Sequence, residues 1–217
     1  MNKILLFRAF VFTLALGYWI YQFFHTEYDN FGIQFRFLTI WALCANVLVA
    51  GQMLRLSLGW SEARWDAFVS LAVIMNMSVV FNYWRIYLAD PANFYEEGEI
   101  IKWYQEYYLH VLGPILLWID AFFIHRVFRR IKGVMIAVLI LGLVYPAWME
   151  FVIQPLNDKP AGTVTNGLPY DFLNNMEIGG RMGFYGAITA INVVFLFLGW
   201  GIQSWINRRV PDVYNRA

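Results

Sequence analysis

Six stretches of about twenty apolar residues, separated by clusters of charged residues, dominate the sequence. The hydrocarbon core of a bilayer is crossed by about 20 helical residues, so each stretch predicts a membrane-spanning helix. We therefore expect an all-α polytopic membrane protein in which residues 1–217 form a single six-helix domain. The predicted spans are approximately 4–24, 37–58, 66–88, 107–124, 134–152 and 184–206.

The composition excludes several other classes of protein. Hydrophobic residues make up 60% of the chain and charged residues 14%, against about 45–50% and about 25% in soluble domains. A chain with 10 Trp, 13 Tyr and 19 Phe is not intrinsically disordered. The formal net charge of +1 gives no field that would attract nucleic acid. Because Cys44 is the single cysteine, no intrachain disulfide or multi-cysteine metal site can form, and we expect no metal and no cofactor.

The distribution of basic residues predicts how the spans are oriented. If the N-terminus is cytoplasmic, eleven basic residues, Arg8 among them, fall on the inner segments and four on the outer ones. Positive charge accumulates on the cytoplasmic side, so both termini are expected inside the cell membrane. The first span is longer than the apolar core of a signal peptide, and we expect it to be retained as an anchor.

Polar residues from four spans converge at one depth. Thr39, Arg85, His110, Tyr145 and Glu150 all fall in the outer third of the membrane when the spans are drawn with 1.5 Å rise per residue. Ionisable groups inside a bilayer are costly and usually face a bundle interior or a cavity, so this layer is a candidate site near the extracytoplasmic side.

The residue types in this layer suit acyl transfer. A hydroxyl becomes a nucleophile when an adjacent base takes its proton, and Thr39 with His110 would supply that pair. Asn82, Arg85 and Tyr145 are candidates to stabilise an oxyanion, and Glu150 is a candidate to orient the imidazole. A site one turn below the surface admits water from outside and an acyl chain from the lipid, so a lipophilic ester is the expected substrate.

Each residue also has a structural interpretation. The Thr39 hydroxyl could bond to a carbonyl of its own helix, and His110 could be a packing residue. Arg85 and Glu150 could neutralise each other as a buried ion pair. Asp120, in the inner half, has no partner at its depth in the sequence pattern except the basic cluster that follows it, and it is left unassigned.

Three further features are interpreted as structural. Ser78 and Asn82 share a helix face and could bond to a neighbouring helix. Gly179, Gly183 and Ala187 recur at four-residue intervals, which would permit close helix approach. The outer segment 153–183 could be a lid, an interfacial hairpin or an ordinary connection.

Three segments resemble the androgen-induced-gene and androgen-dependent TFPI-regulating protein family. They are FLTIWALCAN at 37–46, YLHVLGPI at 108–115 and YPAWME at 145–150, the last followed by a Gly-rich span. The resemblance implies six membrane helices and hydrolysis of fatty acid esters of hydroxy fatty acids. It also implies a catalytic Thr in an aromatic-Leu-Thr motif, which matches Thr39, and a catalytic His four residues before a Pro, which matches His110 and Pro114.

We expect the chain to be a bacterial-type homologue of this family. It departs from the family pattern in two places. The acid of the Tyr-Pro segment, Glu150, is shifted by one residue, and the outer segment 153–183 is longer than expected. The expected partners are a lipid ester substrate and membrane lipids, and nothing indicates an oligomeric state.

Two other functions stay open on the sequence. One is binding of a lipid, sterol or quinone in the same cavity without turnover. The other is haem ligation by His25 and His110, which both lie near the outer face.

Overall fold

The computed structural model describes residues 2–25, 31–89, 102–156 and 167–210, and within these ranges it contains helices and no strand. Six helical stretches are long and apolar enough to cross a membrane. This confirms the predicted all-α polytopic class. The spans are α1 (Lys3–His25), α2 (Leu38–Ser57), α3 (Asp66–Ala89), the stretch Trp103–His125, the stretch Ile131–Leu156 and α8 (Ile178–Arg209).

The fourth and fifth spans are not uniform α-helices. The fourth consists of α4 (Trp103–Tyr107), a π-helical segment (Tyr108–Leu112), α5 (Gly113–Ile119) and a second π-helical segment (Asp120–His125). The fifth consists of α6 (Ile131–Trp148), a π-helical segment (Met149–Ile153) and a 3₁₀ turn (Gln154–Leu156). Two short elements complete the fold, a 3₁₀ helix (Phe31–Arg36) before α2 and α7 (Asp171–Asn174) before α8.

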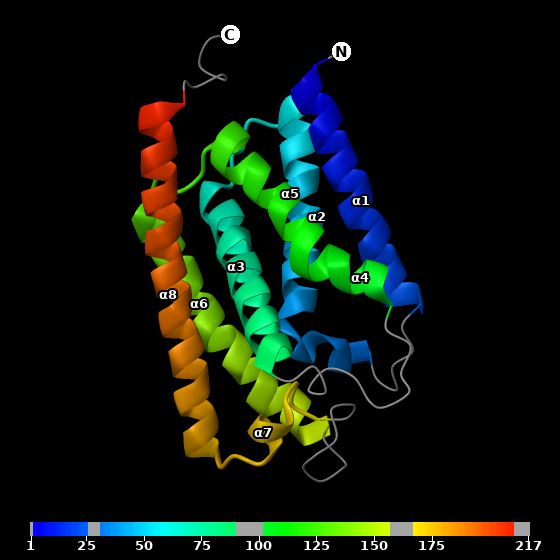
Figure 1. Ribbon diagram of the computed structural model, residues 1–217, viewed down its shortest axis with the longest axis vertical. Coiled ribbons are helices and arrows are strands. Elements are labelled where there is room, and N and C mark those ends of the chain that lie inside the picture. Colours follow the sequence, from blue (N-terminus) through cyan, green and yellow to red (C-terminus); the bar gives the residue numbers. More distant parts are fainter. Residues whose placement is uncertain (1, 26–30, 90–101, 157–166, 211–217) are drawn as a thin grey trace.

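The spans pack as a bundle with α3 at its centre (Figure 1). Helix α1 lies along α2, α8 lies along α6, and α3 contacts α2, α6 and α8. Both chain termini lie at one end of the bundle (Figure 1). We term this the terminal end, and the opposite end, where α2, α4 and α8 begin, the distal end.

The core forms around α3, because the surrounding helices bury its apolar side chains. Ala72, Val73 and Ile74 are fully buried. The outer faces of the bundle carry large exposed apolar side chains instead, such as Phe10 and Leu143. An apolar outer surface of this kind is what a lipid environment requires, because lipid chains solvate apolar groups as well as a protein core does.

The sixth span is longer than predicted, and its small residues do not pack. The prediction began it at 184, but α8 begins at Ile178 and includes Arg181, whose charge is paired with Glu150. A Cβ added at Gly179 or Gly183 would meet no atom within 4 Å. The expected close approach along this stripe is therefore wrong. The tight contacts of the bundle occur at Gly142, against Thr189, and at Gly199, against Phe128, where a Cβ would meet side-chain atoms at 2.6 and 2.5 Å.

Arg8 and Asp120 form a buried ion pair near the terminal end. Arg8 Nε and Nη2 donate to the two carboxylate oxygens of Asp120 at 2.7 and 2.8 Å, and Nη1 donates to Ser57 Oγ at 2.9 Å. Arg8, which the count of basic residues assigned to the inner segments, is buried inside the bundle, with only 1% of it exposed. The partner that the sequence did not show for Asp120 is on α1.

Candidate functional site

Thr39 lies in the first turn of α2, two residues after the N-cap residue Phe37. The carbonyl four residues before it, that of Phe35, accepts a hydrogen bond from Trp41 Nε1 at 2.8 Å. Within the described residues the Thr39 hydroxyl has no hydrogen-bond partner. The interpretation in which this hydroxyl bonds to its own helix therefore does not describe the structure, and the hydroxyl is available to another group.

The fifth span anchors the beginning of α2. The Tyr145 hydroxyl donates to the Arg36 carbonyl at 2.7 Å, and its ring meets the Trp41 ring edge-on with centroids 5.9 Å apart. Arg36 in turn donates to the Gly167 carbonyl at 3.4 Å, which ties in the segment before α7. Tyr145 thus lies at the turn that precedes Thr39, as the common depth predicted, but its hydroxyl proton is engaged by the backbone.

His110 lies in the π-helical segment of the fourth span, and the residues after it explain why the helix widens there. Pro114 has no N–H, so it cannot donate to the His110 carbonyl as an α-helix would require. Gly113 instead donates back to the Tyr108 carbonyl, a π-type bond. The His110 carbonyl accepts from Trp84 Nε1 of α3 at 3.4 Å. Such π-segments are frequent at functional sites, because they redirect side chains.

The His110 ring is fixed on two sides and unpartnered on a third. The Tyr83 ring stacks on it with centroids 3.6 Å apart and planes 8° apart. The Glu106 carboxylate lies 3.4 Å from Nε2. Nδ1 is buried and has no hydrogen-bond partner among the described residues. A buried polar atom without a partner is costly, so Nδ1 marks a place where a ligand or a reacting group would be stabilised.

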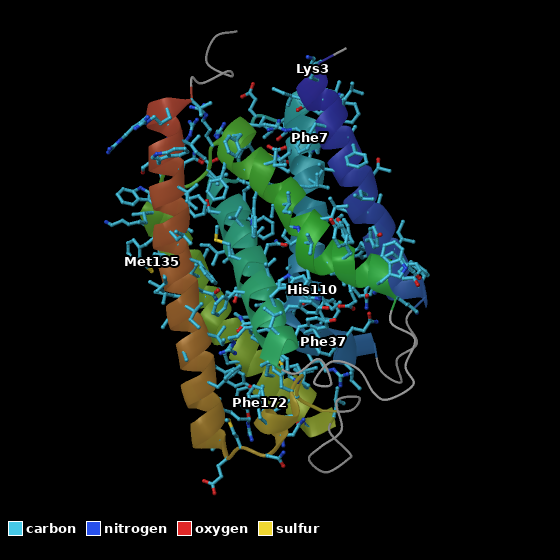
Figure 2. The ribbon with its side chains drawn as sticks, in the orientation of Figure 1. Lys3, Phe7, Phe37, His110, Met135 and Phe172 are labelled. Atoms are coloured by element: carbon cyan, nitrogen blue, oxygen red, sulfur yellow. The ribbon has the colours of Figure 1, made fainter. Side chains whose placement is uncertain are left out.

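A small cavity lies between α1, α2 and the fourth span, and neither Thr39 nor His110 is among the residues that line it. This cavity of about 20 Å³ is bordered by Asn46 on α2 and by Gly113 and Leu117 on α5. Thr39 is seven residues before Asn46, and His110 is seven before Leu117, so each lies about two helical turns from that lining residue of its own helix. Figure 2 shows His110 near the middle of the molecule's height and Phe37, which immediately precedes α2, below it.

Asn82 and Arg85 occupy another face of α3. Asn82 precedes Tyr83 by one residue, and Arg85 follows it by two. Arg85 therefore points about 200° around the helix from the Tyr83 ring, which contacts His110. Asn82 Nδ2 donates to the Ser78 carbonyl of the same helix at 2.8 Å, so the expected interhelical bond is wrong. Arg85 lies beside Asn82 Oδ1 at 3.5 Å. Burial raises the pKa of the Tyr170 phenol to about 12, and the nearby Arg85 charge opposes that rise.

Glu150 has partners other than the predicted ones. Arg181 Nε and Nη2 donate to its two oxygens at 2.8 and 2.7 Å, and the Tyr185 hydroxyl donates at 3.1 Å. The expected pair between Arg85 and Glu150 is therefore wrong. The structure brings Glu106, and not Glu150, to His110. Its position four residues before His110, on the same helix face, is the signal in the sequence that could have identified it.

The described residues contain no group of three His, Cys, Asp or Glu side chains that could hold a metal ion. The His25 side chain, on which the haem alternative depends, lies outside the part of the chain that is described.

The chain was also compared with known proteins. No curated protein and no solved structure matches it. The model of one family, described as FAR-17a/AIG1-like protein, matches residues 4–204. The match includes all six spans and both members of the candidate pair, and the chain therefore belongs to the FAR-17a/AIG1-like family.

Proposed function

We propose that this membrane protein hydrolyses lipophilic carboxylic esters, such as fatty acid esters of hydroxy fatty acids, with Thr39 as nucleophile and His110 as general base. The observation that carries the proposal is the buried, unpartnered Nδ1 of His110, and it is supported by a Thr39 hydroxyl that bonds to no other group among the described residues. Family membership and the resemblance of the two motifs support the reaction class.

The reaction would proceed in two acyl-transfer steps. His110 takes the hydroxyl proton as Thr39 Oγ1 attacks the ester carbonyl, and a tetrahedral oxyanion forms. The intermediate collapses, the bond to the leaving alcohol breaks, and the imidazolium returns the proton to that oxygen. Water, deprotonated by His110, then attacks the acyl-threonine; the fatty acid leaves and the Thr39 hydroxyl is restored.

The first turn of α2 favours the charge that develops in this reaction. The first N–H groups of a helix have no intrahelical acceptor, and the helix dipole places partial positive charge at that end. Phe37 provides no side-chain cap to satisfy them. An oxyanion formed on the Thr39 adduct would therefore lie where backbone donors and the dipole stabilise it, and this effect is larger in a site of low dielectric constant.

The test combines turnover with covalent labelling. Purified protein is assayed on a lipid ester and with a fluorophosphonate probe, as wild type, Thr39→Ala and His110→Ala. We expect each variant to lose hydrolysis by at least about 1,000-fold, and Thr39→Ala to lose the label. Thr13→Ala is the matched control, because Thr13 is an exposed threonine on the outer face of α1.

Two results would contradict the proposal. Full hydrolysis by Thr39→Ala or His110→Ala in folded protein would remove that residue from the chemistry. A wild-type protein that binds the ester without cleaving it or taking the label would instead support the alternative of lipid binding without turnover.

A further inference from the structure

The carboxylate of Glu106 lies one helical turn from His110, and its position relative to the ring is informative. A carboxylate and a His four residues apart on an exposed helix stabilise it by only a few tenths of a kcal/mol, so spacing alone says little. Here, however, the His110 side chain is only 9% exposed and the Glu106 side chain 31%. The contact therefore joins a buried ring to a carboxylate at the border of the bundle.

The two ring nitrogens of His110 have different surroundings. Nε2 lies 3.4 Å from Glu106 Oε2. When the carboxylate is ionised, this oxygen can accept a hydrogen bond but cannot donate one. Nδ1 is buried without a partner among the described residues. A neutral imidazole carries one N–H and one lone pair, and the N–H is favoured at the nitrogen that faces an acceptor. This places the proton on Nε2 and leaves the lone pair on Nδ1.

The surroundings of Glu106 hold it in place. The preceding residues of α4 are attached to α1, since the Tyr21 and Tyr104 hydroxyls lie 2.7 Å apart and the Tyr18 hydroxyl donates to the Tyr104 carbonyl at 3.2 Å. Two residues after Glu106, Tyr108 stacks on Tyr18 with ring centroids 3.8 Å apart. The segment that carries Glu106 is therefore fixed by α1, while Tyr83 of α3 fixes the plane of the His110 ring.

We infer that Glu106 is a positioning residue that holds the His110 proton on Nε2, so that Nδ1 is the nitrogen that acts as general base. The inference rests on the proposed ester hydrolysis and deepens it. When Nδ1 takes the Thr39 proton, the ring becomes an imidazolium, and the Glu106 carboxylate stabilises its positive charge without being protonated itself. The proton then leaves from Nδ1 to the alkoxide of the departing alcohol, and the Nε2 proton stays in place throughout.

The kinetic test is Glu106→Gln, which keeps the shape of the side chain and removes its charge. We expect kcat to fall by about 10- to 100-fold, because the imidazolium loses its compensating charge in the transition state, with KM changed less than about threefold. Glu62→Gln is the matched control, since Glu62 is an exposed glutamate in the loop before α3. Unchanged kcat in Glu106→Gln would overturn the inference.

A spectroscopic test reads the proton position without turnover. In protein labelled with ¹⁵N-histidine, the His110 signals are assigned by their loss in His110→Ala, and the tautomer is read from the two ring-nitrogen shifts above the pH at which the ring titrates. We expect the Nε2-protonated tautomer in wild type and a mixture of tautomers in Glu106→Leu. An Nδ1-protonated ring in wild type would overturn the inference.

The two tests separate this inference from the proposed function. If Thr39→Ala and His110→Ala abolish hydrolysis while Glu106→Gln keeps the wild-type kcat, only the role of Glu106 is wrong. If wild type shows no hydrolysis at all, the proposed function fails, and the tautomer measurement still decides whether Glu106 holds the ring proton.

Discussion

At the scale of single residues, the identity of the partner decides what each intramembrane polar group does. Glu150 was a candidate to orient His110 or to neutralise Arg85, yet Arg181 occupies both of its oxygens. A carboxylate bound at two points by a guanidinium, with Tyr185 as a third donor, has little capacity left for an imidazole. The arrangement indicates a structural role for Glu150, which joins the fifth span to the start of α8.

Glu150→Gln should therefore act mainly on stability. The change leaves the Arg181 guanidinium, whose side chain is 13% exposed, without its counter-charge. We expect the free energy of unfolding to fall by about 3 kcal/mol, and kcat to fall far less than in Glu106→Gln. Thermal unfolding in detergent, with the double variant Glu150→Gln/Arg181→Met as control, measures this. A double variant no more stable than the single one would contradict the pairing.

At the scale of elements, prolines lie beside two of the irregular turns, whereas the π-helical segment Asp120–His125 has no proline next to it. Pro114 follows His110 by four residues and Pro146 lies inside α6, and each removes the backbone donor that the α-helical pattern requires. A π-segment lies beside each proline, at Tyr108–Leu112 and Met149–Ile153. Apolar periodicity locates a span, but it does not reveal a π-helical turn within the span. The fourth span was therefore predicted as one plain helix beginning at 107.

Gly113→Ala tests the turn after His110. An added Cβ would lie 3.0 Å from the Tyr108 carbonyl oxygen and 3.2 Å from its ring, so the π-type turn would have to shift. We expect both the midpoint of thermal unfolding and kcat to fall. Gly186→Ala is the matched control, because its Cβ meets no atom within 4 Å and alanine is the better helix former by about 1 kcal/mol. Equal stability of the two variants would show that the turn tolerates a side chain.

At the scale of the whole molecule, one ion pair connects three spans near the terminal end. Arg8 on α1 reaches Asp120 in the fourth span, and also the Met53 carbonyl and the Ser57 hydroxyl on α2. Helix α1 lies at the side of the bundle with only 17% of its apolar stretch buried, and Arg8 gives it a polar contact with two other spans.

Removing one partner of this pair should loosen the bundle. In Asp120→Asn the Arg8 charge stays buried without compensation, and we expect the free energy of unfolding to fall by about 3–5 kcal/mol. The double variant Arg8→Leu/Asp120→Leu should lose less, because no uncompensated charge remains. Chemical unfolding in detergent, or protease accessibility of α1, distinguishes the two. A double variant less stable than Asp120→Asn would contradict this account.

The sequence by itself determined the class of fold, the number of spans and their boundaries to within about one or two turns. It could do so because every backbone polar group in a bilayer must be bonded within its own segment, so each crossing is a long apolar helix that the residues themselves reveal. It also predicted a common layer for Thr39, His110 and Tyr145, because depth follows from helical rise, and the bond of Tyr145 to the Arg36 carbonyl agrees with this for the start of α2.

Only the tertiary structure decided which polar groups meet. Arg8 and Asp120 are 112 residues apart, and Glu150 and Arg181 are 31 apart. Depth alone gave several possible partners for each charge, and the rotation of each helix about its axis selects one of them. That rotation is set by packing against neighbouring helices, as where Tyr83 stacks on His110 and leaves the Nδ1 edge of the ring as its unpartnered side.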